Sequence, residues 1–131
     1  LLYGDGGNDL VYGNMGDDTC YGGTGADTIR GGQDNDTMIG GAGDDWLFGD
    51  RGADTMSGGL GADTFTIFDG AGVDRVIDFS SAEGDRVRIE GGGTYTVTQQ
   101  GADAVVTVGE AQMTLVGVQA STLPAGWIFA A

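Results

Sequence analysis

The chain has 131 residues, 28 of them glycine, and its 20 acidic side chains are opposed by five arginines and no histidine, which gives a net charge of −15. Such a length allows one ordinary domain at most, and low hydrophobicity with high net charge would normally indicate disorder. The absence of histidine and lysine excludes nucleophilic triads and zinc-protease motifs, and no nucleic-acid partner is expected.

A nine-residue repeat occupies residues 4–66. Aspartate recurs every nine residues, a glycine stands five residues before each aspartate, and an apolar side chain stands two residues after it. A disordered acidic tail needs no such register, so we interpret the period as structure, and it matches the nonapeptide G-G-x-G-x-D-x-U-x of parallel β-helices. The aspartates are Asp9, Asp18, Asp27, Asp36, Asp45, Asp54 and Asp63, and the apolar residues are Val11, Cys20, Ile29, Met38, Leu47, Met56 and Phe65.

Each repeat predicts a turn followed by a short strand. Positions one to six form the turn, because glycine adopts a positive φ freely and Asn or Asp does so at modest cost, as at Asp5, Asn14 and Asp50. Positions seven to nine are β-prone triplets whose middle side chain points inward. Two repeats then make one coil, and odd and even repeats form two facing parallel sheets. The predicted inner columns are Val11, Ile29, Leu47 and Phe65 on one sheet and Leu2, Cys20, Met38 and Met56 on the other.

The stacking of coils predicts a metal site at each turn. The aspartate of one turn lies below that of the turn two repeats later, one strand spacing of about 4.8 Å away, where bare carboxylates repel each other. An ion midway lies about 2.4 Å from each turn, within the Ca²⁺–oxygen range, whereas Mg²⁺ requires about 2.0–2.1 Å. Zinc prefers nitrogen or sulfur ligands. The predicted cofactor is therefore Ca²⁺, bound at several sites.

These residues resemble the repeats-in-toxin (RTX) proteins, through seven copies of the motif over residues 4–66. The resemblance implies a β-roll in which sixth-position aspartates and nearby turn carbonyls of repeats n and n+2 share one Ca²⁺. It implies five full sites, at the pairs Asp9/Asp27, Asp18/Asp36, Asp27/Asp45, Asp36/Asp54 and Asp45/Asp63. The implied carbonyl ligands are second- and fourth-position residues, chiefly Gly23, Gly25, Gly32, Gly41, Gly43, Gly52, Gly59 and Gly61.

Two places depart from the motif. Asp34 replaces the fourth-position glycine, so either it adopts a positive φ and still offers its carbonyl, or its turn is distorted and the sites with Asp18 and Asp54 are weaker. After a slip of two residues, 69–74 mimics an eighth turn, with Asp74 as the aspartate of a sixth site with Asp54 and Val76 as the inward residue.

Beyond the repeats, residues 67–93 resemble the end-piece of serralysin-type secreted metalloproteases, through the frame D-R-V-I-D-F…G-D-R-V-R-I. A solenoid needs a cap because its last coil exposes strand edges and apolar core. Asp78 and Asp85 form a further acidic pair that we include among the candidate metal ligands. The expected capping residues are Phe65, Phe68, Val76, Ile77, Phe79, Val87 and Ile89.

From Thr94 onward, apolar and polar residues alternate between turn signals, which predicts an antiparallel meander over residues 94–131. The ending STLPAGWIFAA has two interpretations. In RTX proteins the C-terminal region addresses the chain to a type I secretion channel, an ABC transporter, and a short apolar end is typical of it. Alternatively, Trp127, Ile128 and Phe129 form a last strand that packs on the meander. The ending is too short for a membrane anchor.

The predicted fold is thus all-β: a parallel β-roll, a two-sheet right-handed solenoid, over residues 1–66, followed by the cap and the meander. We expect Cys20 to be a core residue without a disulfide partner, and we expect no enzyme within this segment. The chain starts in mid-repeat, so we expect it to be the C-terminal piece of a longer bacterial protein, secreted or at the cell surface.

Three functional hypotheses stay open. The first is a calcium-triggered folding and export module, unfolded at low calcium and folded on about five or six Ca²⁺. The second is an adhesive or surface-layer assembly domain that self-associates or attaches to a cell surface. The third is an accessory domain of a secreted protease or polysaccharide-modifying enzyme. The first hypothesis is compatible with either of the other two.

Overall fold

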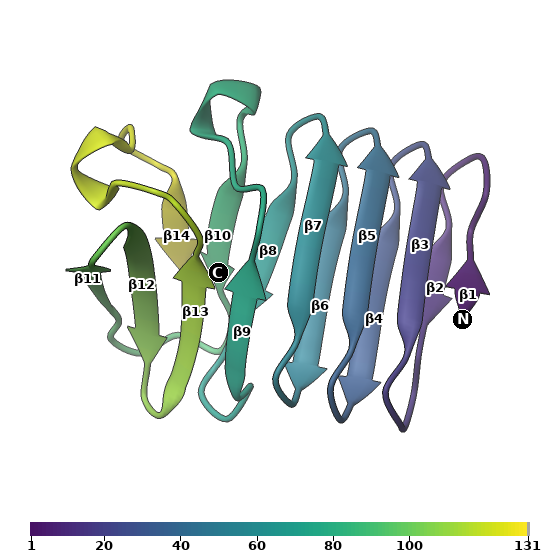
Figure 1. Cartoon of the computed structure of the whole chain (residues 1–131), viewed down its shortest axis with the longest axis horizontal. Coiled ribbons are helices and arrows are strands. Elements are labelled where there is room, and N and C mark those ends of the chain that lie inside the picture. Colours follow the sequence, from purple (N-terminus) through teal and green to yellow (C-terminus); the bar gives the residue numbers. More distant parts are fainter. Residues whose placement is uncertain (131) are drawn as a thin grey trace.

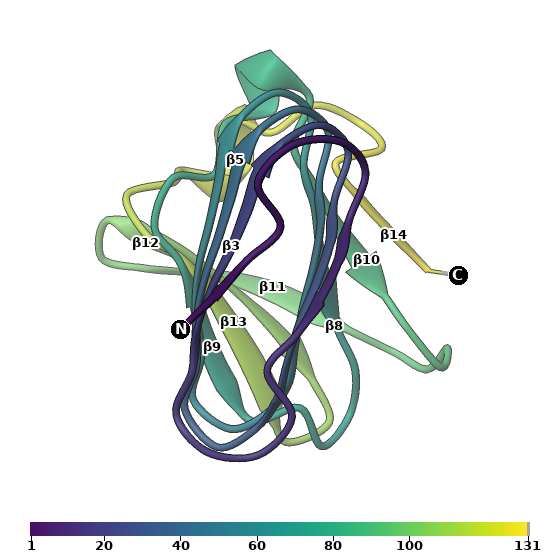
Figure 2. The same ribbon diagram turned by 90° about the vertical axis from the view of Figure 1, so that its right-hand side faces the viewer.

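A computed structural model describes residues 1–130; Ala131, the last residue of the predicted meander segment, lies outside the described residues. The repeats form a stack of flattened coils, with the N-terminal coil at one end and the antiparallel strands at the other (Figure 1). Seen along the stack in Figure 2, successive coils superimpose and enclose a narrow interior. The predicted all-β, two-sheet solenoid is confirmed.

Two sheets make up the solenoid. One contains β1 (Leu2–Tyr3), β3 (Thr19–Thr24), β5 (Thr37–Ala42), β7 (Thr55–Leu60) and β9 (Val73–Val76), and the other contains β2 (Leu10–Tyr12), β4 (Thr28–Gln33), β6 (Trp46–Arg51), β8 (Thr64–Ile67) and β10 (Arg86–Ile89). Neighbouring strands within these two sets pair in parallel, and the register joins equivalent repeat positions, as Ile29 with Leu47 and Cys20 with Met38.

The core is the inward column of each sheet, as the sequence predicts. Ile29, Leu47 and Phe65 are fully buried on one sheet, and Cys20, Met38 and Met56 on the other. Val11 is 5% exposed, and Leu2 in the first coil is only half-buried because no coil covers it. Each sheet contributes one side chain per coil, so the core is thin and depends on every rung.

The strands are longer than the predicted triplets. In β3 to β7 they run for six residues and include positions one to three of the following repeat, so the turn is limited to positions four to six. Parallel pairing continues through the second-position glycine, for example between Gly23 and Gly41. A Cβ on Gly41 would lie 2.1 Å from the carbonyl oxygen of Gly23, so the close stacking of rungs requires glycine there.

Acidic and amide residues adopt positive φ where the repeat requires it. Asp5, Asn14 and Asp50 have φ values of 73°, 74° and 65° at the second position. Asp34 has a φ of 79°, which supports the first of the two alternatives for this turn. The turn keeps its bonds to the neighbouring rungs, because the Gln33 N–H donates to the Asn14 carbonyl at 2.7 Å.

The C-terminal part closes the stack. Strands β11 (Thr96–Gln100), β12 (Asp103–Val108) and β13 (Ala111–Leu115) form the predicted antiparallel meander, and β13 joins the solenoid through parallel pairing with β9. Of the expected capping residues, Phe65, Val76, Phe79, Val87 and Ile89 are buried and Phe68 is partly buried against the core. Ile77 was assigned wrongly, because it points outward from the end of β9 and is 48% exposed.

The last strand does not lie where the sequence interpretation placed it. Strand β14 (Ile128–Ala130) pairs in parallel with β10 in the opposite sheet, rather than with the meander. Strand β14 thus covers an edge of β10 that would otherwise be exposed at the end of that sheet. Trp127 packs edge-on against Phe79 of the cap, with ring centroids 6.2 Å apart. One 3-10 helix, Ser81–Glu83, lies between β9 and β10, and another, Ala120–Thr122, lies between β13 and β14. Within residues 1–130, no helix has the length and apolar character needed to span a membrane.

The thin core predicts very different effects of the same substitution, Leu to Asp, at a buried and at an exposed position. Leu47→Asp should abolish folding under conditions in which the wild type folds, because an unpaired carboxylate in the core costs several kcal/mol, about as much as the stability of a small domain. Leu60→Asp, at a side chain that is 68% exposed, should leave folding nearly unchanged. Circular dichroism and thermal unfolding measure both. Equal behaviour of the two variants would contradict the assignment of the inward column.

Candidate metal centre

Carboxylates form a row along each edge of the solenoid, where the turns stack. Asp9, Asp27, Asp45 and Asp63 follow one edge, and Asp18, Asp36 and Asp54 follow the other. In each row the Oδ1 of one aspartate accepts the backbone N–H of the aspartate 18 residues earlier, as Asp27 does from Asp9 at 2.8 Å. The structure therefore joins all five predicted pairs across neighbouring rungs.

The second carboxylate oxygen of each of these aspartates has no partner. The Oδ2 atoms are buried and accept no hydrogen bond. Buried polar atoms are almost always hydrogen-bonded, so a repeated exception indicates a missing partner rather than a local defect. The affected oxygens are the Oδ2 atoms of Asp9, Asp18, Asp27, Asp36, Asp45, Asp54, Asp63 and Asp74.

The first-position glycine leaves the room for this oxygen. A Cβ built on Gly22 would lie 2.6 Å from Asp27 Oδ2 and 2.6 Å from the carbonyl oxygen of Gly40 in the next coil. The same arrangement recurs at Gly40, between Asp45 Oδ2 and the Gly58 carbonyl. Any side chain would therefore displace a carboxylate oxygen, which explains the glycine that stands five residues before each aspartate.

Burial makes ionisation of these carboxylates unfavourable. Burial, with a smaller contribution from Asp85 and Asp45, raises the pKa of Asp63 to about 7, although the N–H of Asp45 opposes the shift. Burial likewise raises the pKa of Asp36, Asp45, Asp54, Asp74 and Asp85. A cation held beside these oxygens would remove the cost of their charge.

The structure places Asp74 and Asp85 at the ends of the two rows. Asp74 Oδ1 accepts the Asp54 N–H at 3.1 Å, and its Oδ2 is buried without a partner, as in the repeats. Asp85 Oδ1 accepts the Asp63 N–H at 2.9 Å, but its Oδ2 accepts the Ser80 N–H. Each row thus gains one residue after the regular period has ended.

Asp78 has a different environment. Its carboxylate accepts hydrogen bonds from the Ser57 hydroxyl and from the backbone N–H groups of Gly58 and Gly59. In earlier coils the N–H of a first-position glycine donates instead to a carbonyl of the next rung, as Gly4 does to Tyr21. Asp78 therefore replaces main-chain acceptors for the part of β7 that lies beyond its pairing with β9.

The fifth position of the repeat also has a role, which sequence reasoning missed. Side-chain oxygens at this position accept the backbone N–H of the fifth residue two repeats later, as Asn35 does from Ala53 at 2.9 Å. The same bond occurs at Asn8, Asp17 and Asp44. The recurrence of Asn or Asp just before the sixth-position aspartate was the available signal. This ladder holds neighbouring turns together without an ion.

The donor set fits a hard, oxygen-binding cation. Within residues 1–130, no three His, Cys, Asp or Glu side chains gather into a metal-binding cluster, because the carboxylates come in pairs from neighbouring rungs. Completing a six- to eight-coordinate shell requires main-chain carbonyls. The predicted second- and fourth-position glycines, from Gly23 to Gly61, all have positive φ. Carboxylate and carbonyl oxygens suit Ca²⁺ and not zinc.

Comparison with known proteins supports this interpretation of the repeats. The family model described as RTX calcium-binding nonapeptide repeat (4 copies) matches residues 1–29 and 30–65. No curated protein matches the chain.

Solved structures are similar over almost the whole chain. The extracellular lipase LipA from Serratia marcescens matches with a TM-score of 0.59 and 17% identity over 95% of this chain and 38% of the lipase. The AlgE6R3 subunit of the Azotobacter vinelandii mannuronan C5-epimerase matches with a TM-score of 0.47 and 27% identity, over 94% of this chain and 78% of that subunit. The chain therefore spans well under half of the lipase, and the likeness to it concerns the fold.

The nine-residue period, the two-sheet solenoid and the family match agree in the same part of the chain. Residues 1–65 belong to the family of RTX calcium-binding nonapeptide repeats, and they form a structural calcium-binding β-roll.

Proposed function

We propose that this chain is a calcium-dependent folding module: disordered at low calcium, and folded when Ca²⁺ occupies the two edges of the solenoid. The buried and unpartnered Oδ2 atoms in both rows carry the proposal. Without a cation they leave carboxylates desolvated and close to one another, in a chain of net charge −15. Five Ca²⁺ ions would add ten positive charges. Each ion would join two neighbouring rungs, so that binding one ion prepares the next site.

We assign five ions to the pairs predicted from the repeats and a sixth to Asp54 and Asp74. The unpartnered, fully buried Oδ2 of Asp74 supports this sixth site. Asp63 and Asp85 form a further candidate pair, although the Ser80 N–H already occupies one oxygen of Asp85. Asp78 is the weakest candidate ligand, since three donors already bind its carboxylate. The second- and fourth-position carbonyls complete the shells.

The same proposal gives the module its place in a larger protein. Calcium affinities in the extracellular range, about 10⁻⁴–10⁻³ M per site, would keep the chain unfolded inside a bacterium and fold it outside. An unfolded C-terminal segment suits passage through a type I secretion channel. The similar lipase is described as extracellular, which agrees with a module attached to a secreted enzyme. We assign no catalytic role to residues 1–130.

The central test is a calcium titration followed by circular dichroism. At pH 8 the calcium-free chain should give a disordered spectrum, and the β spectrum should appear cooperatively as Ca²⁺ is added, near 10⁻⁴–10⁻³ M in order of magnitude. Mg²⁺ at equal concentration should not replace it. A β spectrum that is already complete in excess chelator would refute the proposal.

Two aspartate variants test whether the ions bridge neighbouring rungs. Asp36 belongs to two proposed sites, with Asp18 and Asp54, whereas Asp9 belongs to one. Because the stability of stacked repeats is roughly a sum of nearest-neighbour terms, Asp36→Ala should raise the calcium midpoint and reduce the steepness of folding far more than Asp9→Ala. Titration of each variant gives both quantities. Equal effects would mean that each turn binds its ion alone.

The raised pKa values predict an unusual pH dependence for the calcium-free chain. Between the pKa of an unfolded aspartate, about 3.9, and the raised pKa of Asp63, about 7, the folded state binds more protons than the unfolded state. The free energy of unfolding must therefore fall as pH rises through this window. In calcium-free buffer the β signal should be larger at pH 5 than at pH 8, and Asp63→Asn should weaken this dependence. A β signal that increases with pH would contradict it.

A further inference from the structure

Two of the five pairs of stacked regular turns, 13–18 with 31–36 and 31–36 with 49–54, carry four acidic side chains each, and the other three pairs carry three. Turns 31–36 and 49–54 contain Asp36 and Asp54, and in addition Asp34 and Asp50 at positions where the other regular repeats mostly have glycine. The side chains of Asp34 and Asp50 add two negative charges to a region that already holds two buried carboxylates. Repulsion among the four carboxylates makes a positive charge along this edge stabilising.

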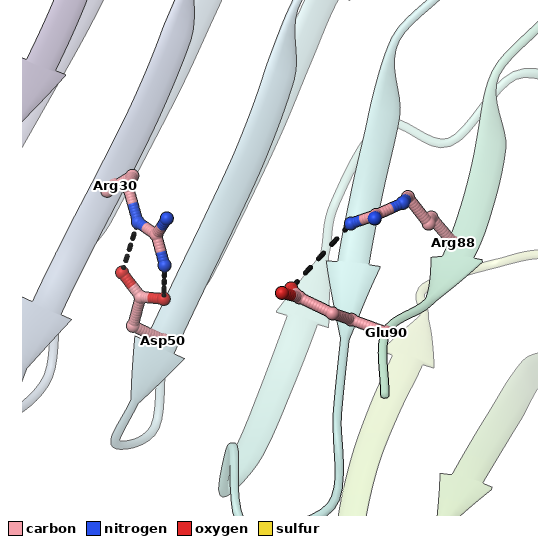
Figure 3. Close-up of polar contacts among 4 residues, drawn as sticks. All are labelled: Arg30, Asp50, Arg88 and Glu90. Atoms are coloured by element: carbon pink, nitrogen blue, oxygen red, sulfur yellow. Dashed lines mark hydrogen bonds and ion pairs between the residues drawn. The ribbon is translucent and has the colours of Figure 1, made fainter. Parts of the chain in front are cut away.

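Arg30 supplies a positive charge at this place. It lies in the middle of β4, directly before Gly31, and reaches across to Asp50 of β6 in the next rung (Figure 3). Arg30 Nε donates to Asp50 Oδ2 at 3.0 Å, and Nη2 donates to Oδ1, so the contact is bidentate. The guanidinium also lies over the Phe48 ring, 4.8 Å from its centroid. Stacking and the two-pronged contact fix the position of the side chain.

The arrangement differs from the other ion pair among the described residues. Arg88 Nη1 and Glu90 Oε2 are 3.6 Å apart (Figure 3). The two residues lie close together along one segment of the chain, so their contact connects no rungs. Arg30 and Asp50 connect the two turns that also meet through the Asp36 N–H and Asp54 Oδ1, at 2.8 Å. An arginine and a candidate calcium site thus span the same gap.

We propose that Arg30 is a built-in cation that clamps turns 31–36 and 49–54 together and so positions Asp36 and Asp54 for Ca²⁺. The inference rests on the proposed function and deepens it. Guanidinium keeps its charge at every physiological pH, so the clamp needs no bound ion of its own. This pair of turns then stays associated at calcium concentrations at which the neighbouring pairs have separated, and its site fills early in folding.

The clamp requires Arg30 and Asp50 to act as one unit. Removing only Arg30 leaves the Asp50 carboxylate unpaired beside Asp54. Replacing Asp50 by glycine, as at Gly41 and Gly59, removes that charge and suits the positive φ, so the clamp is no longer needed. The effects of the two substitutions are therefore strongly non-additive, which a double-mutant cycle measures.

The experiment is hydrogen exchange at calcium concentrations just below saturation, on the wild type, Arg30→Gln, Asp50→Gly and the double variant. The Asp36 and Thr55 amides report on the clamped turns, and the Asp45 and Thr64 amides report on the opposite edge. Arg30→Gln should reduce protection of the first two amides by about twofold to fivefold, the range for a partly exposed ion pair, and spare the other two. The double variant should match Asp50→Gly.

Arg75→Gln is the matched control, because Arg75 is exposed and makes no ion pair within residues 1–130. Equal protection of the Asp36 and Thr55 amides in Arg30→Gln and Arg75→Gln would overturn the clamp. The clamp would also be overturned if Arg30→Gln reduced this protection as much in the Asp50→Gly background as in the wild type. If Arg30→Gln does not fold at any calcium concentration, rescue by Asp50→Gly supports the clamp and failure of rescue overturns it. A wild type that folds without calcium refutes the proposed function instead, and leaves the coupling of Arg30 and Asp50 measurable.

Discussion

The structure depends on parallel strand register, which repeats every side chain at one strand spacing along the stack. The register places apolar side chains on apolar side chains inside the coils, and in the turns it places carboxylate on carboxylate. The first result stabilises the fold and the second opposes it. Under the proposed function a solvent cation resolves the conflict, because it would occupy the same interval between every two rungs. Folding and ion binding would then be one event.

Much of the repeat region could be predicted because a strict period fixes each residue's environment. The inward columns, the pairing of repeats n and n+2, and the positive φ of Asp5, Asn14 and Asp50 all follow from position within the nonapeptide. Strand length did not follow. Glycine has low β propensity, yet the tight stacking of the main chain draws positions one to three into the sheets, which no single repeat reveals.

The cap was less predictable because its contacts are unique. Asp85 continues a carboxylate row 22 residues after Asp63, and Asp78 supplies acceptors to Gly58 and Gly59. Both spacings differ from the 18 residues that separate equivalent positions of the repeats, so only the folded arrangement reveals the two roles. The same applies to β14, whose partner β10 lies about forty residues away in the sequence, and to Arg30, whose partner Asp50 stands outside the repeat register at 20 residues.

The division of the cap between the two sheets decides how such a chain can change in length. The meander attaches through β13 to the sheet that contains β3, β5, β7 and β9, and β14 attaches through β10 to the sheet that contains β4, β6 and β8. Strands β9 and β10 in turn pair with the last two regular strands, β7 and β8. A nonapeptide inserted earlier in the stack would move only the strands before it to the opposite sheet and would leave both attachments of the cap unchanged. Growth or loss of the solenoid by tandem duplication can therefore proceed one nonapeptide at a time.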